Sequence, residues 1–218
     1  MTPLFEFDHV SVQKGDALIL DDVNIDIADS GITMVVGPSG SGKSTLLRCC
    51  NRLEPITAGT LRYRGTDVTE LDPLAHRRRV AMVFQRPTTF PGTVLDNLRA
   101  VATDLGESTA IELLHRVALD DALLHQQADT LSGGEAQRLA IARALTTGPE
   151  VILADEPTSA LDSSAAERLE GLARSLASDG LPLIIVTHDL DQVARLADHV
   201  FEVRDGRVSG ATPRGDRG

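Results

Sequence analysis

Two kinds of hydrophobic pattern divide the chain. Near the N-terminus, hydrophobic and polar residues alternate over residues 4–12 and again over 23–27, as they do in strands with one buried face. We expect these segments to form an antiparallel sheet with one face exposed to water. Later segments are continuously hydrophobic, which is typical of parallel strands covered on both faces. These segments are ITMVV, VAMVF, VILA and LIIVT, at residues 32–36, 80–84, 151–154 and 183–187.

Helical patterns alternate with the continuous strands, and this order predicts an α/β core with right-handed crossovers. The alternation stops at residues 87–147, which contain helical patterns and no convincing strand. We therefore expect an all-helical lobe inserted into a single domain that spans residues 1–218. Asp205-Gly206 lies between two short alternating runs and predicts a hairpin. The expected division is a core at 1–86 and 148–210, a helical lobe at 87–147 and a flexible tail at 211–218.

Composition argues against several classes of protein. The 218 residues carry a formal net charge of −11 at pH 7, which disfavours binding to the phosphate backbone of nucleic acids. The sequence has no run of about 18 hydrophobic residues that could cross a membrane, and its N-terminus does not resemble a secretory signal. Its two cysteines, Cys49 and Cys50, are adjacent and cannot form a disulfide framework, so we expect a reducing cytoplasm.

A glycine-rich loop follows the strand at residues 32–36 and precedes a helical pattern, and it matches G-x-x-x-x-G-K-[ST]. Its glycines let backbone N–H groups turn toward a phosphate, and the helix adds its positive N-terminal end. Lys43 can reach the β- and γ-phosphates of a nucleotide, and the Ser44 hydroxyl can bind Mg²⁺. A chance match is the alternative, but the strand and the helix supply the context that the motif requires. The candidate nucleotide-binding residues here are Gly37, Pro38, Ser39, Gly40, Ser41, Gly42, Lys43, Ser44 and Thr45.

Two carboxylates, Asp155 and Glu156, follow the strand at residues 151–154. They lie at the carboxyl edge of the predicted parallel sheet, where ligands bind. Because successive side chains of a strand point in opposite directions, Asp155 can hold Mg²⁺ while Glu156 acts as a general base on an attacking water. Acidic residues also begin ordinary turns, here before Pro157. That alternative weakens only when the carboxylates are considered together with the phosphate loop.

Two more polar residues end strands at the same predicted edge. The amide oxygen of Gln85 can bind Mg²⁺ or the attacking water, and the imidazole of His188 can form a hydrogen bond with a γ-phosphate. Each residue alone is equally consistent with a polar surface position. Their convergence with the phosphate loop carries more weight than either residue. The candidate catalytic residues are Glu156, His188, Gln85 and Lys43, and the candidate metal ligands are Ser44, Gln85 and Asp155.

A second helix begins with two glycines, in the stretch LSGGE. Ser132 and Glu135 match the capping box S-x-x-E, and an ordinary helix start explains them. It does not explain Gly133 and Gly134, because each glycine weakens a first turn by up to about 1 kcal/mol relative to alanine. Glycines suit a place where a ligand touches the backbone, and helix N-termini attract anions. Ser132, Gly133 and Gly134 are therefore candidates for binding a nucleotide that a second copy of the chain presents.

The chain resembles the nucleotide-binding subunits of ATP-binding cassette (ABC) transporters. The resemblance covers nearly all 218 residues and rests on GPSGSGKST, Gln85, LSGGEAQRLAIARAL, VILADEP, SALD and His188, in the family's order and spacing. It implies a P-loop NTPase fold with a mainly parallel core sheet, and a Mg²⁺-dependent ATPase that binds ATP and Mg²⁺. It also implies a head-to-tail dimer, in which each ATP lies between the phosphate loop of one chain and Ser132 and Gly134 of the other. Asp162 would cross that interface, although it is equally suited to cap the helix that starts at Ser163.

The resemblance also implies partners. Besides a second nucleotide-binding subunit, we expect integral membrane permease subunits, and an extracytoplasmic binding protein if the transporter is an importer. The segment after Gln85 would hold a short helix of the permease. Phe90, Val94 and Leu98 are candidates for that groove, or for the core of the lobe. We expect a peripheral protein at the cytoplasmic face of the cell membrane that binds no nucleic acid, and the direction of transport stays open.

Two alternatives and one departure accompany this interpretation. An ABC-type ATPase of DNA repair or translation is the second candidate, but those relatives tend to carry coiled-coil, zinc-binding or tandem additions that this sequence lacks. A scaffold that binds nucleotide without hydrolysing it is disfavoured by the intact Lys43, Asp155 and Glu156. By spacing, Lys14 stands where the family usually has an aromatic residue that stacks on adenine. We therefore expect weaker nucleotide affinity and looser base selectivity.

Overall fold

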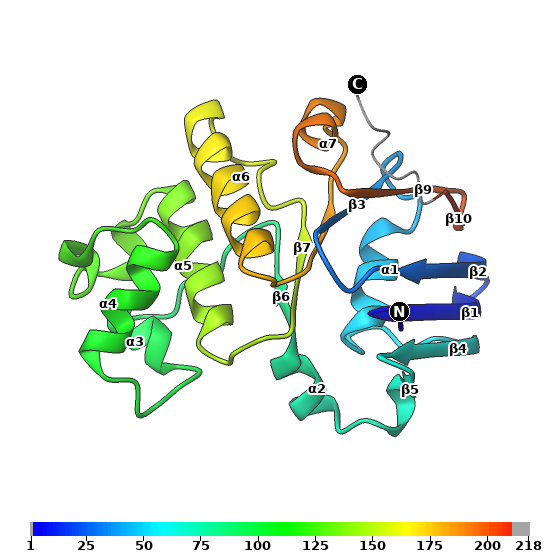
Figure 1. Ribbon diagram of the computed structural model, residues 1–218, viewed down its shortest axis with the longest axis horizontal. Coiled ribbons are helices and arrows are strands. Elements are labelled where there is room, and N and C mark those ends of the chain that lie inside the picture. The colour runs from blue at the N-terminus through cyan, green and yellow to red at the C-terminus, as the bar shows by residue number, and fades with distance from the viewer. Residues whose placement is uncertain (1, 211–218) are drawn as a thin grey trace.

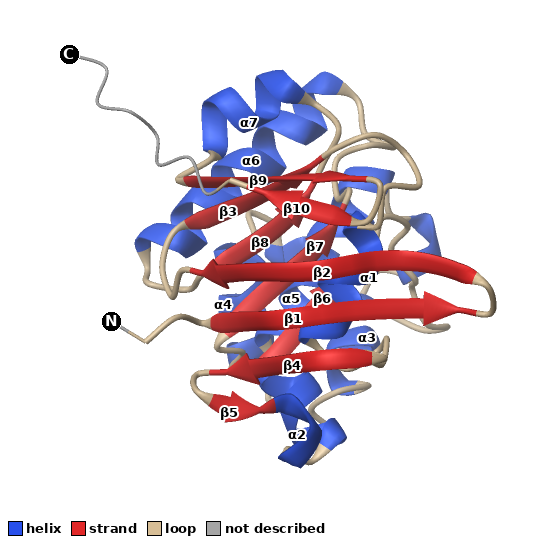
Figure 2. Ribbon diagram, turned by 90° about the vertical axis from the view of Figure 1, so that its right-hand side faces the viewer, coloured by secondary structure: helices blue, strands red, loops and turns tan. Residues whose placement is uncertain are grey.

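The computed structural model describes residues 2–210, so the tail expected at 211–218 lies outside the described residues. Strands of the described chain form two sheets, and the first of them faces the viewer in Figure 2. This sheet has the strand order β2-β1-β4-β5, and its neighbouring strands run antiparallel. Its strands are β1 (Phe5–Lys14), β2 (Ala17–Ile27), β4 (Ala58–Tyr63) and β5 (Thr66–Asp67).

The second sheet has the strand order β10-β9-β3-β8-β7-β6. Its strands run parallel except for β10, which pairs antiparallel with β9. Every residue of β3, β7 and β8 is buried, as expected for strands with helices or another sheet on both faces. The strands are β3 (Ile32–Val36), β6 (Val80–Val83), β7 (Val151–Asp155), β8 (Leu183–Val186), β9 (His199–Arg204) and β10 (Arg207–Ser209).

Helices cover both faces of the second sheet (Figure 1). Helix α1 lies between the two sheets, whereas α5 and α6 pack on the opposite face of the second sheet, and α3 and α4 lie beyond α5. The helices are α1 (Lys43–Cys50), α2 (Pro73–Arg79), α3 (Val94–Arg99), α4 (Glu107–Arg116), α5 (Gly133–Leu145), α6 (Ser163–Ser178) and α7 (Leu190–Leu196). Short 3₁₀ turns occupy Val68–Glu70, Asp121–Leu123 and Ala128–Thr130.

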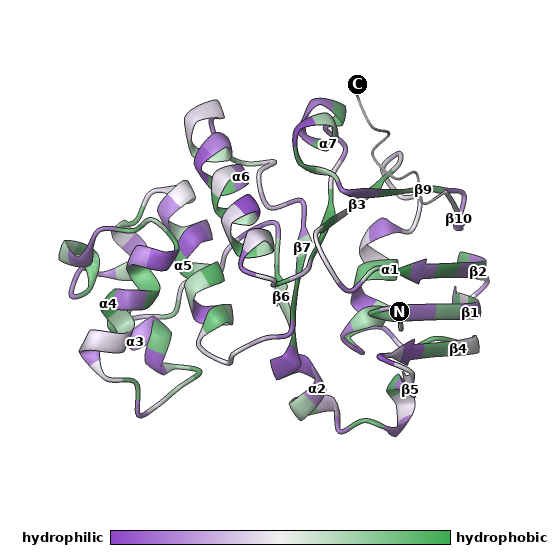
Figure 3. Ribbon diagram, viewed as in Figure 1, coloured by the Kyte–Doolittle hydropathy of each residue, from purple (hydrophilic) through white to green (hydrophobic). Residues whose placement is uncertain are grey.

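Two hydrophobic clusters fill the spaces on either side of the second sheet. Adjacent residues of β3 belong to different clusters, because Val35 faces α1 and the antiparallel sheet while Met34 faces the side of α5 and α6. The cluster on the Met34 side continues without interruption into Leu98 of α3 and Leu114 of α4. Figure 3 shows the corresponding pattern, in which hydrophobic and hydrophilic residues alternate along α5 and α6. The helical segment therefore shares its core with the main sheet.

The predicted fold class is confirmed: an antiparallel N-terminal sheet precedes a mainly parallel core sheet with helices on both faces. The hairpin at Asp205-Gly206 is also present, and both residues adopt the positive φ values that such a turn requires. Between α4 and α5, within the segment expected to be helical, the chain forms only 3₁₀ turns, at Asp121–Leu123 and Ala128–Thr130. None of the helices between residues 2 and 210 is both long and hydrophobic enough to span a bilayer.

Candidate nucleotide-binding and catalytic site

The phosphate loop is a tight turn whose shape depends on glycine. Gly37 has a φ of +144°, and a Cβ atom added there would lie 2.1 Å from the carbonyl oxygen of Val203 in β9. Gly42 has a φ of +111° and is the residue from which α1 begins. It has no side chain to cap the helix, so the first N–H groups of α1 face the loop. A larger residue would collide with the backbone of β9 at position 37 and with that of β2 at position 42, so either substitution would displace the loop.

Lys43 points back into this loop from the first position of α1. It is only 6% exposed, and its ammonium donates hydrogen bonds to the carbonyl oxygens of Gly37 at 2.9 Å and Pro38 at 2.8 Å. A buried ammonium is costly unless it is paired. Carbonyl oxygens carry no full charge, so an anionic phosphate in the loop would complete the environment of Lys43. The loop therefore fits the phosphates of a nucleoside triphosphate.

Asp155 joins the end of β7 to α1. Its Oδ1 atom accepts a 2.7 Å hydrogen bond from the Ser44 hydroxyl, and its Oδ2 atom lies 3.5 Å from Nη2 of Arg48. A carboxylate beside a hydroxyl supplies the oxygen ligands that Mg²⁺ prefers. Within residues 2–210, no group of three or more His, Cys, Asp or Glu side chains could hold a metal ion by itself. These residues thus fit an ion that takes its remaining ligands from water and phosphate.

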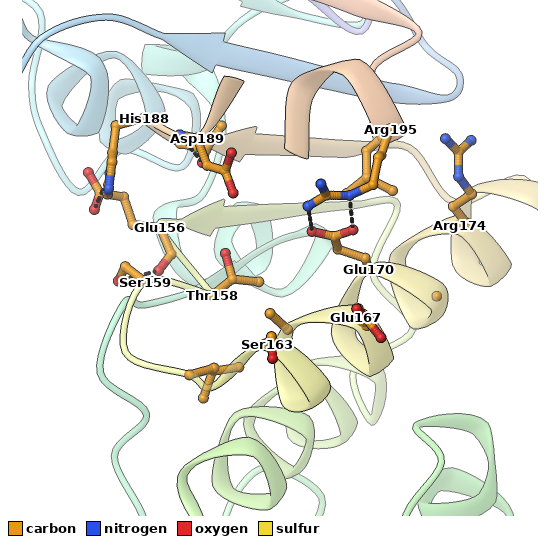
Figure 4. Close-up of a pocket in the computed structure, with 15 residues that line it drawn as sticks. Glu156, Thr158, Ser159, Ser163, Glu167, Glu170, Arg174, His188, Asp189 and Arg195 are labelled. Carbon is orange, nitrogen blue, oxygen red and sulfur yellow. Dashed lines mark hydrogen bonds and ion pairs between the residues drawn. The ribbon is translucent and has the colours of Figure 1, made fainter. Parts of the chain in front are cut away.

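Glu156 leaves the strand in a different direction. Its φ is +47°, a left-handed conformation that is rare for residues other than glycine, and its N–H bonds to the carbonyl oxygen of Val186 in β8. The carboxylate lies 3.3 Å from Nδ1 of His188, which follows β8. Both residues line a cavity of about 730 Å³, and Figure 4 shows their side chains turned toward each other at one side of it. The divergence of Asp155 and Glu156 expected from the sequence is therefore present.

Gln85 lies close to the same segment. Its Nε2 atom donates to the Ser159 hydroxyl at 3.0 Å, and that hydroxyl donates to the carbonyl oxygen of Glu156. The neighbouring carbonyl of Phe84 accepts a 3.1 Å hydrogen bond from Gln137 of α5. The sheet edge thus brings together Gln85, Glu156 and His188, and it connects them to the helical lobe.

The capping box predicted at the start of α5 is confirmed. The hydroxyl and N–H of Ser132 both donate to the carboxylate of Glu135, and the N–H of Glu135 donates to the hydroxyl of Ser132. The two bonds from Ser132 stabilise the charged carboxylate and hold the pKa of Glu135 below its usual value. Gly133 is exposed, with only Leu161 within ordinary contact distance of an added Cβ. Gly134 is buried, and an added Cβ would lie 2.9 Å from Cβ of Ala165 in α6. Packing within the chain is therefore one reason for glycine at position 134, beside the ligand contact that the sequence predicts.

A groove of about 360 Å³ connects this helix start with the beginning of α6. Asp162 lies in the groove and caps α6 by accepting the N–H of Ala165 at 2.8 Å. Arg138 also lines it, and its buried Nε and Nη1 atoms have no hydrogen-bond partner in the described structure. Burial lowers the pKa of Arg138, although the group stays cationic at neutral pH. With Arg168 beside it, the groove suits an anion. We call it the signature groove, and its lining residues are Ser132, Gly133, Gly134, Glu135, Arg138, Ala160, Leu161, Asp162, Ala165 and Arg168.

The candidate residues thus form two separate clusters. One joins the phosphate loop, Asp155, Glu156, Gln85 and His188, and the other is the signature groove. Figure 1 shows α1 and α5 on opposite sides of β7, so the two helices that begin these clusters do not meet within one chain. Sequence reasoning missed Arg48. It lies four residues after Ser44 in α1, and this helical spacing was the signal that could have placed it near Asp155.

Two further expectations concern residues outside these clusters. Lys14 ends β1, and its ammonium lies 2.5 Å from a carboxylate oxygen of Glu54. Of the three expected groove residues, Phe90 is 45% exposed and lines a cavity of about 590 Å³ between α2 and α5. Val94 and Leu98 are fully buried on the inner face of α3. These two residues belong to the core of the lobe, so only Phe90 is available to a partner.

The comparisons with known proteins agree with this geometry. The sequence model of the ABC transporter family matches residues 20–159. The chain is 44% identical over 207 residues to "Phosphate import ATP-binding protein PstB 3" of Natronomonas pharaonis, covering 88% of this chain and 75% of the relative. It is 38% identical over 216 residues to "Glutamine transport ATP-binding protein GlnQ" of Escherichia coli, covering 94% and 90%.

Solved structures give the same result. The dimeric structure of an ATP-binding cassette in a post-hydrolysis state, bound to ADP and Pi, superposes with a TM-score of 0.84 at 32% identity, covering 96% of this chain and 98% of that one. The structure of cbiO1 from Clostridium perfringens, part of the ABC transporter complex cbiONQ, has a TM-score of 0.88 at 26% identity, covering 98% and 89%. On the match to the family model and the identity to these relatives, this chain belongs to the ABC transporter family, as an ATP-binding and ATP-hydrolysing subunit.

Proposed function

We propose that this subunit hydrolyses ATP between two copies of the chain and thereby powers transport through separate membrane subunits. The observation that carries this proposal is the separation of two anion-binding clusters within one chain. The phosphate loop has its own helix, α1, whereas the signature groove has α5 and the unpaired Arg138. A head-to-tail pairing places the groove of one copy over the phosphate loop of the other, and a symmetric dimer then has two such sites.

The residues of the phosphate-loop cluster divide the work of hydrolysis. Lys43 would bind the β- and γ-phosphates, and Asp155 and Ser44 would hold Mg²⁺, which neutralises charge on the transferred phosphoryl group when bound. Glu156 accepts a proton from the attacking water, because its carboxylate is paired with His188 at the sheet edge, whereas that of Asp155 is held by Ser44 and Arg48. His188, 3.3 Å from Glu156, orients that carboxylate and can donate to a phosphate oxygen.

A membrane subunit would dock on the cavity beside Phe90. Leu74, Phe84, Phe90 and Val101 are exposed hydrophobic residues that line it. Its other lining residues include Arg77, Arg78, Arg86 and Arg143, and no acidic residue. Because the whole chain carries a charge of −11, these arginines form a local exception. They favour a short amphipathic helix with acidic residues, presented by the permease at the cytoplasmic face of the cell membrane.

The relatives suggest the direction of transport. By their names, the relatives from Natronomonas pharaonis and Escherichia coli act in phosphate import and glutamine transport. On this basis we favour an importer of a small hydrophilic solute, which would include an extracytoplasmic binding protein. The identity of the solute would follow from uptake assays with phosphate and amino acids in cells that lack this chain.

Two substitutions test the proposed catalytic roles. Glu156→Gln should leave ATP binding intact and lower turnover about 10²–10⁴-fold, because the general base is lost. With ATP bound and uncleaved, this variant should accumulate as a dimer, which size-exclusion chromatography with light scattering would detect. Lys43→Ala should weaken ATP binding about 10-fold or more, measured by calorimetry. Undiminished turnover in Glu156→Gln, or a variant that binds ATP but stays monomeric, would contradict the proposal.

A further inference from the structure

Gln192 of α7 is a buried side chain that contacts two different structural units. It is 2% exposed, and its Nε2 atom donates to the hydroxyl of Thr158 at 3.0 Å and to Oε1 of Glu170 at 3.2 Å. An amide nitrogen has two N–H donors, so these two bonds use its full donor capacity. The side chain is thereby held in one orientation. It lines a small cavity that shares Thr158, Glu170 and Leu196 with the larger cavity beside Glu156 and His188.

Thr158 connects Gln192 to the segment that carries Glu156. It lies two residues after Glu156, and its carbonyl oxygen accepts the N–H of Leu161 in the same turn. The N–H and hydroxyl of Ser159 both bond to the carbonyl oxygen of Glu156. This segment is a compact turn, so a displacement of Thr158 would be transmitted to the backbone of Glu156.

The backbone of Gln192 connects it to the segment that carries His188. Asp189 follows His188 and caps α7 by accepting the N–H groups of Asp191 and Gln192 at 2.9 and 3.1 Å. The N–H of Asp189 bonds in turn to the hydroxyl of Thr187, at the end of β8. One residue therefore contacts the segments on both sides of the pair formed by Glu156 and His188.

An ion pair fixes Gln192 to α6. Arg195, one turn further along α7, donates to both carboxylate oxygens of Glu170, from Nε at 2.9 Å and from Nη2 at 2.8 Å (Figure 4). The Glu170 side chain is only 9% exposed, whereas that of Arg195 is 52% exposed, so the bidentate contact joins a buried carboxylate to a guanidinium that solvent reaches. It holds α6 and α7 at a set separation, with the amide of Gln192 beside it.

From these contacts we infer that Gln192 is a positioning residue, which sets the approach of Glu156 to His188. The inference rests on the proposed catalytic roles of these two residues. Gln192 contacts neither the phosphate loop nor Asp155 in any of its hydrogen bonds. Its loss should therefore affect the chemical step rather than the binding of ATP. Displacing a catalytic carboxylate by about 1 Å from its productive position lowers the rate of the chemical step by up to about 10²-fold.

The substitution Gln192→Met tests this role, because methionine has a similar volume and no N–H donor. We expect kcat for ATP hydrolysis to fall about 10- to 100-fold, while KM for ATP changes by less than about 2-fold. Asp191→Asn is the matched control, because Asp191 is an exposed neighbour on the same helix that bonds to Asp189 through its backbone N–H. Its kinetics should equal those of the wild type, and thermal melting should show that both variants are folded.

Thr158→Val tests the same contact from its other side, since it removes the hydroxyl that accepts from Gln192 and leaves Gln192 in place. It should reproduce the loss in kcat, and the double variant should be no slower than Gln192→Met alone, because both remove one interaction. An unchanged kcat, a rise in KM that accounts for the whole effect, or losses that multiply in the double variant would each overturn the inference. If Glu156→Gln itself keeps full turnover, the proposed function fails instead, so the two failures can be told apart.

Discussion

At the scale of single residues, His76 of α2 is a buried imidazole outside both candidate clusters. It is 1% exposed, and its Nε2 atom lies 2.8 Å from the carbonyl oxygen of Cys50, which can only accept a hydrogen bond. The proton of the neutral ring must therefore be on Nε2. Among residues 2–210, its buried Nδ1 atom has no hydrogen-bond partner, and the ring forms a T-shaped contact with Tyr63. The surroundings of His76 therefore favour the uncharged imidazole.

The pKa of His76 is therefore lowered from its ordinary value of 6.5, chiefly by burial, with smaller contributions from Arg52, Arg77 and Arg79, while the bond to Cys50 opposes the shift. Below pH 6.5 the imidazole of His76 is protonated in the unfolded chain and stays neutral in the folded chain until the pH falls further. The free energy of unfolding should therefore fall as the pH falls. The slope for one such group is at most about 1.4 kcal/mol per pH unit. His76→Gln keeps a donor toward Cys50 but does not titrate, so its stability should depend less on pH.

The measurement is urea denaturation of both proteins between about pH 5 and pH 7, the range in which histidine titrates. The exposed His125 provides the control, because its ring is 67% exposed and has no buried environment to lose. His125→Gln should follow the wild-type curve. Equal pH dependence in the wild type and in His76→Gln would show that His76 does not control this part of the stability.

The local sequence pattern was sufficient to predict some residues of the candidate site but not others. Lys43, Asp155 and His188 could be placed because each lies at the end of a hydrophobic strand or in a motif with fixed spacing. Ser159 and Gln192 could not, since their partners are distant in the sequence and polar residues in loops and short helices give no periodic signal. The contacts that support a site are thus less predictable than the site itself.

At the scale of elements, the start of α5 is determined by its contact with α6. Gly134→Ala would place a methyl group 2.9 Å from Cβ of Ala165, so the helices must shift. We expect a loss of about 1–3 kcal/mol in the free energy of unfolding. Combining it with Ala165→Gly should restore the space, so the two changes should be coupled and not additive. Gly133→Ala is the matched control and should be nearly neutral, because its nearest neighbour is an ordinary 3.7 Å away.

Urea denaturation of the single and double variants would measure this coupling, and ATPase assays would separate packing from ligand contact. If Gly134 serves packing alone, activity should return together with stability in the double variant. A stable but inactive double variant would support the view that the ligand itself requires glycine at this position.

Long hydrophobic elements were predictable, whereas short ones depended on tertiary contacts. The strands from β3 to β8 with continuous hydrophobic runs lie within one residue of their expected bounds. Strand β4 and helices α2 and α7 were not predicted. The two helices have only seven residues each, and they depend on caps from Asp72 and Asp189 and on packing against the core. Short helices are marginal without such contacts, so their sequence pattern is weak.

At the scale of the whole molecule, charge is distributed unevenly. The chain is acidic overall, with 32 Asp and Glu against 21 Lys and Arg. Arginines nevertheless gather at the cavity beside Phe90, and in the signature groove Arg138 and Arg168 offset the charges of Glu135 and Asp162. An acidic surface repels a second copy at long range, so a dimer needs a local attraction, which a nucleotide phosphate with its Mg²⁺ would supply by binding to cationic groups of both copies. The sequence indicates a partner chain for the same reason, because it contains two helix starts that can each bind phosphate.

The two-copy site can be tested by mixing inactive variants. Lys43→Ala damages only the phosphate-loop cluster, and Gly133→Asp adds a negative charge only to the exposed start of α5, where aspartate is favourable for the helix. In a head-to-tail dimer of one chain of each kind, both defects fall in one site and the other site is intact. An equal mixture should therefore recover up to about a quarter of the wild-type sites, because half of the dimers are mixed. A mixture of Lys43→Ala with Glu156→Gln is the matched control, since each site then contains one damaged phosphate-loop cluster and no activity should return. Recovery in both mixtures, or in neither, would contradict a site shared between two chains.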